Sequence, residues 1–170
     1  MTIADVYLLE SLKSFKGLKS TVENAISQLS IEQIHYIPSS ESNSIAIIMK
    51  HLAGNLISRW TDFLTTDGEK PNRDRDNEFI DDYNNRDELI SYWNSAWEVL
   101  FNTLNELKEE DLLKEIFIRG ESHTVIRAIN RQLVHYAYHT GQIVYLAKMQ
   151  KDKEWKTLSI ARGKSNDYKF

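Results

Sequence analysis

Four long stretches of the chain repeat apolar residues at alternating spacings of three and four, and this pattern constrains the fold more than any other feature of the sequence. Such spacing places the apolar side chains on one face of an α-helix. We therefore predict helices over about residues 2–29, 44–63, 86–107 and 123–149. Because each helix buries one stripe, four of them packed together close a hydrophobic core. The predicted fold class is all-α, with a single domain over residues 1–170.

Capping and breaking residues set the expected helix boundaries. Asn43 and Ser44 are both good N-caps for the second helix, and the fourth begins at His123 or Thr124. The chain has only 6 Gly and 2 Pro, about 5% together against roughly 12% in average usage. So few breakers disfavour a strand-rich fold with many tight turns.

Three segments lack helical periodicity. Residues 65–85 form a long polar stretch, in which Asp67-Gly68 is a turn signal and Pro71 rules out an uninterrupted helix. Residues 109–122 are a connection, expected to be extended at Ile116-Phe117-Ile118 and to turn at Gly120.

The tail, residues 150–170, carries three large apolar side chains. These residues are Trp155, Leu158 and Ile160. They predict that the tail packs against the rest of the chain.

Composition excludes several classes of protein. The chain has no Cys, so it has no disulfide, no thiolate metal site and no Cys nucleophile. With a net charge of −4 and no long basic stretch, a nucleic acid is not expected as a partner. The longest run without charged side chains, residues 132–147, is too short and too polar for a membrane span. The N-terminus lacks the features of a signal peptide, and we expect a cytoplasmic protein.

His135 and His139 lie four residues apart in the strongest helical stretch. This spacing puts both imidazoles on one face, one turn apart, where they can bind a single metal ion. The same face holds Arg131 and Gln142, and it lies roughly 100° round the helix from the apolar stripe. The pair is therefore expected at the flank of the core.

His51 takes a similar angular position on the second predicted helix, on a face that also holds Asn55. If the two helices are neighbours, their polar flanks converge in one cleft. Three neutral imidazoles leave a tetrahedral site one ligand short, and water or substrate would fill it, as in catalytic metal sites. The alternative is that these histidines are ordinary core or surface residues, since an i, i+4 pair alone is a weak signal.

Other groups of residues carry weaker signals. Glu32 and His35 form one Glu-x-x-His, but a di-iron bundle needs two such motifs on core helices. The acidic alternation ending at Glu78 resembles a calcium loop without its glycine, so we expect a solvated charged loop. His123 is expected to cap a helix or lie at the surface. The sequence between His135 and His139 holds no Glu, which disfavours an HExxH zinc protease.

Two segments resemble motifs of the DinB-like superfamily: residues 43–55 (NSIAIIMKHLAGN) resemble its second helix and residues 131–143 (RQLVHYAYHTGQI) its last bundle helix. Residues 59–71 (RWTDFLTTDGEKP) and 118–121 (IRGE) look like one DinB-like bacterial family of unknown function, and residues 158–165 (LSIARGKS) are similar to its ending.

The resemblance implies an up-down-down-up four-helix bundle with a long crossover after the second helix. It implies a divalent metal ion bound by one histidine of the second helix and two of the fourth, which correspond to His51, His135 and His139. It also implies a homodimer. Characterised relatives include bacillithiol transferases and the mycothiol-dependent maleylpyruvate isomerase, in which the metal is thought to activate a low-molecular-weight thiol.

The leading functional hypothesis is a metal-dependent thiol S-transferase-type enzyme with Zn²⁺ or Ni²⁺ as cofactor and a small-molecule substrate. Asn55, Arg131 and Gln142 are candidates for substrate binding. The alternative is a non-catalytic metal-binding or stress-response protein of unknown ligand. In a third interpretation the ion is mainly structural.

Overall fold

The computed structural model describes residues 1–83 and 85–167. Four of its helices have sixteen or more residues, and each overlaps one predicted helix. They are α1 (Ile3–Ile26), α3 (Ile45–Trp60), α4 (Arg86–Glu106) and α5 (Val125–Lys151). The predicted domain, the polar stretch and the tail include residues 84 and 168–170, which lie outside the described residues.

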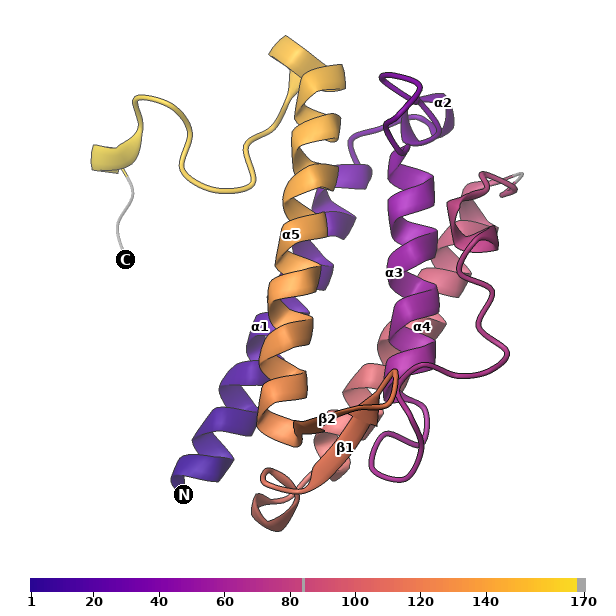
Figure 1. Cartoon of the computed structure of the whole chain (residues 1–170). Coiled ribbons are helices and arrows are strands. Elements are labelled where there is room, and N and C mark those ends of the chain that lie inside the picture. Colours follow the sequence, from indigo (N-terminus) through magenta and orange to yellow (C-terminus); the bar gives the residue numbers. More distant parts are fainter. Residues whose placement is uncertain (84, 168–170) are drawn as a thin grey trace.

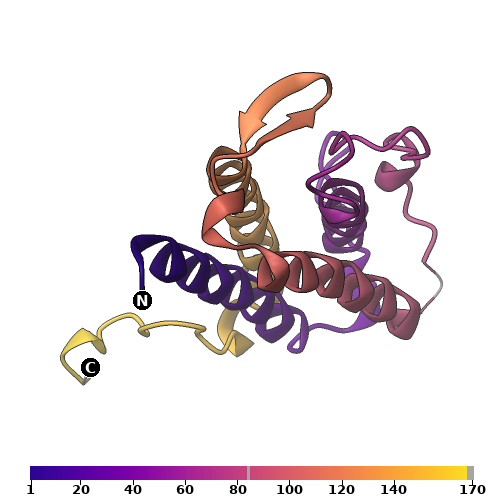
Figure 2. The same ribbon diagram turned by 90° about the horizontal axis from the view of Figure 1, so that it is seen from below.

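The four long helices lie side by side around one hydrophobic core (Figure 1). α1 packs along α5 and α3 packs along α4, while α3 and α5 also contact each other. Seen from below, the loop that follows α3 and the hairpin that precedes α5 lie on the same side of the helices (Figure 2). This side carries the residues discussed below.

Side-chain caps begin all four long helices. In each, an oxygen of the residue before the helix accepts a hydrogen bond from the backbone N–H three residues further on, which satisfies one of the free donors of the first turn. The caps are Thr2, Ser44, Asn85 and Thr124. Ser44 was one of the two predicted caps of the second helix, and this prediction is confirmed.

Two helices end three residues before the predicted boundary, whereas α4 ends one residue before it. α1 ends at Ile26, and Ser30 then caps the short helix α2 (Ile31–Ile34). α3 ends at Trp60, and the left-handed Asp62 (φ 48°) follows. Leu29 and Phe63 are nevertheless buried. The apolar spacing thus continued for a few residues beyond the helical hydrogen bonding, which is why the predicted helices were too long.

One aromatic residue from each long helix meets at the centre of the core. Phe15 of α1 lies edge-on to Trp60, Trp97 and Tyr136, with ring centroids 6.1, 6.5 and 5.8 Å away. All four side chains are at most 1% exposed. Such edge-to-face contacts add to the stabilisation from burial, and here they link α1 to the other three long helices.

A two-stranded antiparallel hairpin, β1 (Glu115–Ile118) and β2 (Glu121–Thr124), stands between α4 and α5. The protein is therefore mostly helical rather than all-α, and the expected extension at residues 116–118 is confirmed. Arg119 and Gly120 form the turn with φ of 56° and 73°, the positive values that a two-residue hairpin loop requires. Because β2 occupies residues 121–124, α5 begins at Val125 and not at residue 123.

His123 is buried in β2, so its predicted position in a cap or at the surface was wrong. Its side chain is 4% exposed, and neither ring nitrogen has a hydrogen-bond partner among the described residues. Side chains alternate between the two faces of a strand, and the alternation in β2 turns His123 inward. A helix start at residue 123 predicts no such alternation.

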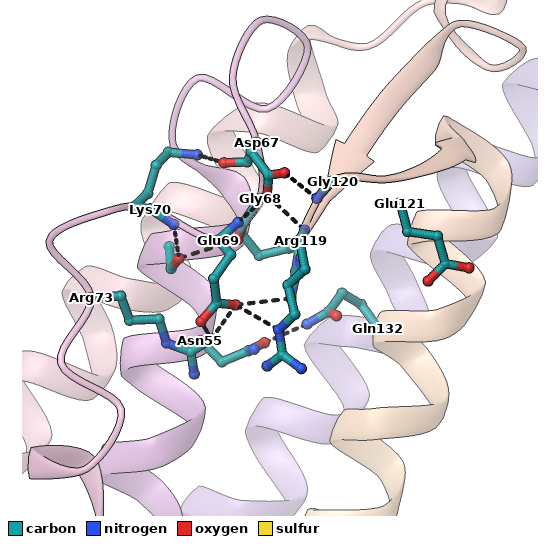
Figure 3. Close-up of polar contacts among 12 residues, drawn as sticks. Asn55, Asp67, Gly68, Glu69, Lys70, Arg73, Arg119, Gly120, Glu121 and Gln132 are labelled. Atoms are coloured by element: carbon teal, nitrogen blue, oxygen red, sulfur yellow. Dashed lines mark hydrogen bonds and ion pairs between the residues drawn. The ribbon is translucent and has the colours of Figure 1, made fainter.

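Asp67 ties the loop after α3 to the hairpin (Figure 3). Its carboxylate accepts hydrogen bonds from the backbone N–H groups of Glu69, Arg119 and Gly120 at 2.7, 2.8 and 2.7 Å. Burial alone would raise the pKa of Asp67, but these three bonds outweigh it and hold the pKa below its usual value. The turn signal in the sequence thus also marks a long-range contact.

The tail packs only in part. Trp155 is half-buried against the core, and the Gln28 side chain bonds to both backbone groups of Lys156, at 2.8 and 3.0 Å. Leu158 and Ile160 are 36% and 43% exposed, so the predicted packing of the tail is confirmed around Trp155 and Lys156 and does not extend to these two side chains.

Within the described residues, no helix combines the length and the apolarity that crossing a lipid bilayer requires.

The Asp67 contacts predict a stability effect. Replacing Asp67 by Ala leaves three backbone N–H groups without their carboxylate acceptor, and it should lower the free energy of unfolding by about 2 kcal/mol. Urea denaturation measures this. Asp76→Ala is the matched control, because the Asp76 side chain makes no capping bond. Equal stability of the two variants would contradict the role given to Asp67.

Candidate metal centre

Three histidines from two helices come together at the flank of the core. His51 lies on α3, and His135 and His139 lie one turn apart on α5. One ring nitrogen of each lies within 4.8 Å of the others. The ring centroids are 4.8 to 5.5 Å apart. His135 and His139 are half-buried, as their angular position in the sequence predicted, whereas His51 is buried more deeply than a flank position implies.

Glu78 fixes the orientation of the His51 ring. Glu78 lies in the 3₁₀ turn η1 (Asn77–Phe79), and its Oε2 is 2.9 Å from His51 Nδ1. A carboxylate only accepts, so Nδ1–H donates and Nε2 carries the free lone pair. Histidines that bind metal ions almost always donate their other ring N–H to a carboxylate, a backbone carbonyl or water. Phe79, the next residue, stacks on the His51 ring with centroids 5.0 Å apart.

Gly54 makes room for Glu78 against α3. A Cβ at Gly54 would lie 2.3 Å from Glu78 Oε1 and 2.8 Å from its Cδ. Glycine in a helix interior costs roughly 0.5–1 kcal/mol relative to alanine. Here the missing side chain lets the carboxylate approach the helix closely enough to reach His51, one turn earlier on α3.

Arg73 holds the other side of the Glu78 carboxylate. Its Nε and Nη2 donate to the two oxygens at 2.7 and 2.8 Å, a bidentate pair, and its Nη1 donates to Glu69. Burial alone would raise the pKa of Glu78, but the His51 ring and the guanidinium outweigh it and keep the pKa below its usual value. Glu78 is therefore an anion at neutral pH.

Gln142 orients His139 in the same way. Its Oε1 lies 2.7 Å from His139 Nδ1, so the imidazole donates there and presents Nε2 on its other side. Gln142 was predicted to bind substrate, and the structure places it against a candidate metal ligand.

Burial keeps the α5 histidines neutral. The pKa of His135 is lowered to about 3, mainly by burial and to a smaller extent by the neighbouring His139 and His51. Burial also lowers the pKa of His139. Only a neutral imidazole can donate its lone pair to a metal ion, so these side chains are ready to bind one at neutral pH.

The three imidazoles therefore fit a divalent metal ion by their donor chemistry. Two of them, His51 and His139, have Nδ1 engaged, which leaves Nε2 for the ion. A set of three neutral nitrogens suits Zn²⁺, Ni²⁺ and related ions and does not select among them.

The other predicted substrate residues occupy two different environments. Asn55 is buried beneath the histidines, where its Oδ1 accepts from Gln132 Nε2 at 2.6 Å and from the Tyr136 hydroxyl at 3.2 Å. Arg131 is exposed and lines a pocket beside His51 and His135. Among the three candidates, Asn55 and Arg131 therefore reach this pocket.

Glu32, His35 and His123 take no part in this centre. His35 Nδ1 pairs with Asp81 at 2.7 Å, away from the three histidines.

Glu78 and Arg73 were missed by sequence reasoning. The expectation of a solvated loop was wrong for Glu78, which is 5% exposed. The sequence does carry one signal for Glu78, which is the glycine at position 54, one turn after His51. A glycine inside a helix indicates that another part of the chain approaches the backbone closely there.

Comparison with known proteins supports this fold. A family model described as protein of unknown function (DUF1572) matches residues 2–164. No curated protein matches the chain. The chain is similar to the structure of a conserved protein from Enterococcus faecalis, with a TM-score of 0.66, 16% identity and coverage of 88% of this chain and 97% of that one. It is also similar to a DinB-like protein, YjoA, from Bacillus subtilis, with a TM-score of 0.67, 16% identity and coverage of 87% and 96%.

The lowered pKa of His135 predicts a pH dependence of stability in the metal-free protein. The unfolded His135 binds a proton near pH 6.5, whereas the folded one binds it only near pH 3. The unfolded state therefore gains protons first, and the free energy of unfolding should fall as pH drops below 6.5. Urea titrations with chelator at pH 7 to 5 measure this, above the range in which carboxylates dominate. The His135→Gln variant should show a shallower slope, and an equal slope would contradict the assignment.

Proposed function

This chain belongs to the DUF1572 family of proteins of unknown function, and we propose that it binds a divalent metal ion through His51, His135 and His139. The observation that carries the proposal is the cluster itself: three ring nitrogens within 4.8 Å, on two helices. The contacts of His51 with Glu78 and of His139 with Gln142 support it, because they select the ring nitrogen that would face the ion.

We propose further that the protein is a metal-dependent thiol S-transferase-type enzyme. A bound ion would supply Lewis-acid chemistry, lowering the pKa of a bound thiol so that a thiolate forms at neutral pH. The chain has no Cys, so the thiol must come from a separate small molecule, of the kind used by bacillithiol transferases. Zn²⁺ and Ni²⁺ are the ions we favour. A non-catalytic metal-binding protein is the alternative.

The chain's own residues would prepare the site for this chemistry. Glu78 and Gln142 hold two rings in the tautomer that binds the ion. Phe79 covers one face of the His51 ring and limits the approach of water from that side. Arg131, at the pocket that adjoins His51 and His135, would position the substrate.

We also propose the order and direction of the four long helices. The course of the chain in Figure 1 supports a four-helix bundle of up-down-down-up order with a long crossover after α3. The single domain, the homodimer and the cytoplasmic location stay predictions.

Metal binding is tested directly by loading the chelated protein with Zn²⁺ or Ni²⁺ and measuring the affinity by calorimetry. Removing a residue that hydrogen-bonds to a metal ligand usually lowers the metal affinity 10- to 100-fold. Removing a ligand itself, in His51→Ala, should therefore lower the metal affinity by about 100-fold or more. His35→Gln is the control and should bind like the wild type. Wild-type protein that binds no metal with micromolar affinity would contradict the proposal.

The same preparations test the enzyme. Metal-loaded protein is incubated with bacillithiol and chlorodinitrobenzene, and a rate equal to that of His51→Ala would contradict the transferase. Retained metal without turnover over a panel of thiols and electrophiles would favour the non-catalytic alternative.

The close approach at Gly54 predicts a second effect on metal affinity. A methyl group in Gly54→Ala must displace the Glu78 carboxylate from His51, and the metal affinity should fall about 10-fold. Gly17→Ala on α1 is the matched control, because nothing lies within 4 Å of its added Cβ. Both variants gain helix propensity, so a loss confined to Gly54→Ala reports the position of Glu78. Unchanged metal affinity in Gly54→Ala would contradict that role.

A further inference from the structure

A pocket of about 160 Å³ adjoins the histidines and is strongly basic. Figure 3 shows several of its groups between α3, the loop after it and α5. Five arginines line it together with two amide side chains and two of the three histidines. These residues are Arg59, Arg73, Arg75, Arg119, Arg131, Asn55, Gln132, His51 and His135. This volume is enough for one small charged group.

Two of the arginines are neutralised within the protein. Arg73 forms its bidentate pair with Glu78 and a further bond to Glu69. Arg119 Nε lies 3.3 Å from Glu69 Oε2 (Figure 3). Glu69, Glu78 and the nearby Asp67 are therefore engaged in holding the loop and the hairpin in place.

Arg59 is the arginine that the protein leaves least satisfied. It lies on α3, is 2% exposed, and its Nε and Nη1 have no hydrogen-bond partner among the described residues. Its nearest carboxylate oxygen, Glu69 Oε2, lies 3.9 Å from Nη2, too far for a hydrogen bond. Burial and then Arg131 lower the pKa of Arg59 to about 10, so it remains a cation at neutral pH.

Arg75 and Arg131 add charge at the rim of the pocket. Both are exposed, and within residues 1–83 and 85–167 no carboxylate lies within 4.0 Å of either guanidinium. The pocket therefore holds more guanidinium groups than the surrounding carboxylates neutralise. A buried cation without a partner is costly, and a bound anion would offset that cost with charge-assisted hydrogen bonds.

The amide groups at the floor add a neutral donor. Asn55 Oδ1 is occupied by Gln132 and Tyr136, and this fixes the direction of the Asn55 side chain. Its Nδ2 group makes no hydrogen bond to another described residue and can donate to an oxygen in the pocket.

We propose that this pocket binds the carboxylate or phosphate group of an anionic substrate, with Arg59 and Arg131 as its main partners. Because His51 and His135 form part of the same pocket wall, the anionic group would anchor a substrate whose reacting atom lies at the histidine cluster. This proposal rests on the proposed function in one respect only, namely the reaction that the bound substrate undergoes. The binding of the anion depends on the arginines and the Asn55 amide, and it requires no metal ion.

The test is calorimetric titration of the chelated protein with inorganic phosphate and, separately, with malonate, at constant ionic strength. Constant ionic strength is needed because salt screens exposed charges. We expect saturable binding by the wild type and at least tenfold weaker binding by Arg131→Gln, about 1.4 kcal/mol. Tighter binding of phosphate assigns a phosphoryl group, and tighter binding of malonate assigns a carboxylate.

Arg127→Gln is the matched control. Arg127 lies one turn before Arg131 on α5, is exposed, and faces Glu121 instead of the pocket. Its loss changes the net charge equally and should leave anion binding unchanged. A second variant, Arg59→Gln, tests the inner wall after circular dichroism has confirmed its fold. Wild-type protein that binds neither anion, or equal binding by Arg131→Gln and Arg127→Gln, would overturn the proposal.

Parallel titrations with metal ions separate this proposal from the metal centre. Metal binding without anion binding would overturn the substrate class and leave the metal centre standing. Anion binding that is lost in Arg131→Gln, by a protein that binds no metal, would support the pocket and overturn the proposed function.

Discussion

The rest of the site depends on the contact between α3 and a buried carboxylate of the loop that follows it, Glu78. Glu78 would be costly to bury alone, but His51 and Arg73 engage both of its oxygens. Gly54 removes the side chain that would keep Glu78 away from the helix. This one residue therefore brings the loop after α3 onto the helix, orients a candidate ligand and holds an arginine at the pocket.

A second carboxylate connects that loop to the hairpin. Asp67 accepts the backbone N–H groups of both turn residues, Arg119 and Gly120, whose positive φ values point those groups to the same side. The hairpin thus carries Arg119 to the pocket, where Glu69 meets it. The candidate metal centre and the basic pocket share α3, α5 and the loop after α3, and the hairpin adds Arg119 to the pocket.

The helices and their starts could be predicted because their causes are local. Apolar spacing identifies the buried face, and Ser44 caps α3 from its own side chain. The predicted ends of α1 and α3 lie too far along the chain, since the buried Leu29 and Phe63 continue the apolar pattern beyond the last helical turn. His123 was misplaced because a four-residue strand between two helices has too short a pattern to be told from a helix start.

The sequence by itself determined the mostly helical fold and the three histidines as candidate ligands, since a spacing of four on a helix brings two side chains together whatever surrounds it. Only the tertiary structure decided that His51 lies beside His135 and His139, and that Glu78 and Gln142 orient the rings of His51 and His139. It alone also decided that arginines from α3, the loop after α3, the hairpin and α5 surround one pocket. These contacts join residues from separate elements of the chain, and their geometry depends on how the helices pack, which no local pattern encodes.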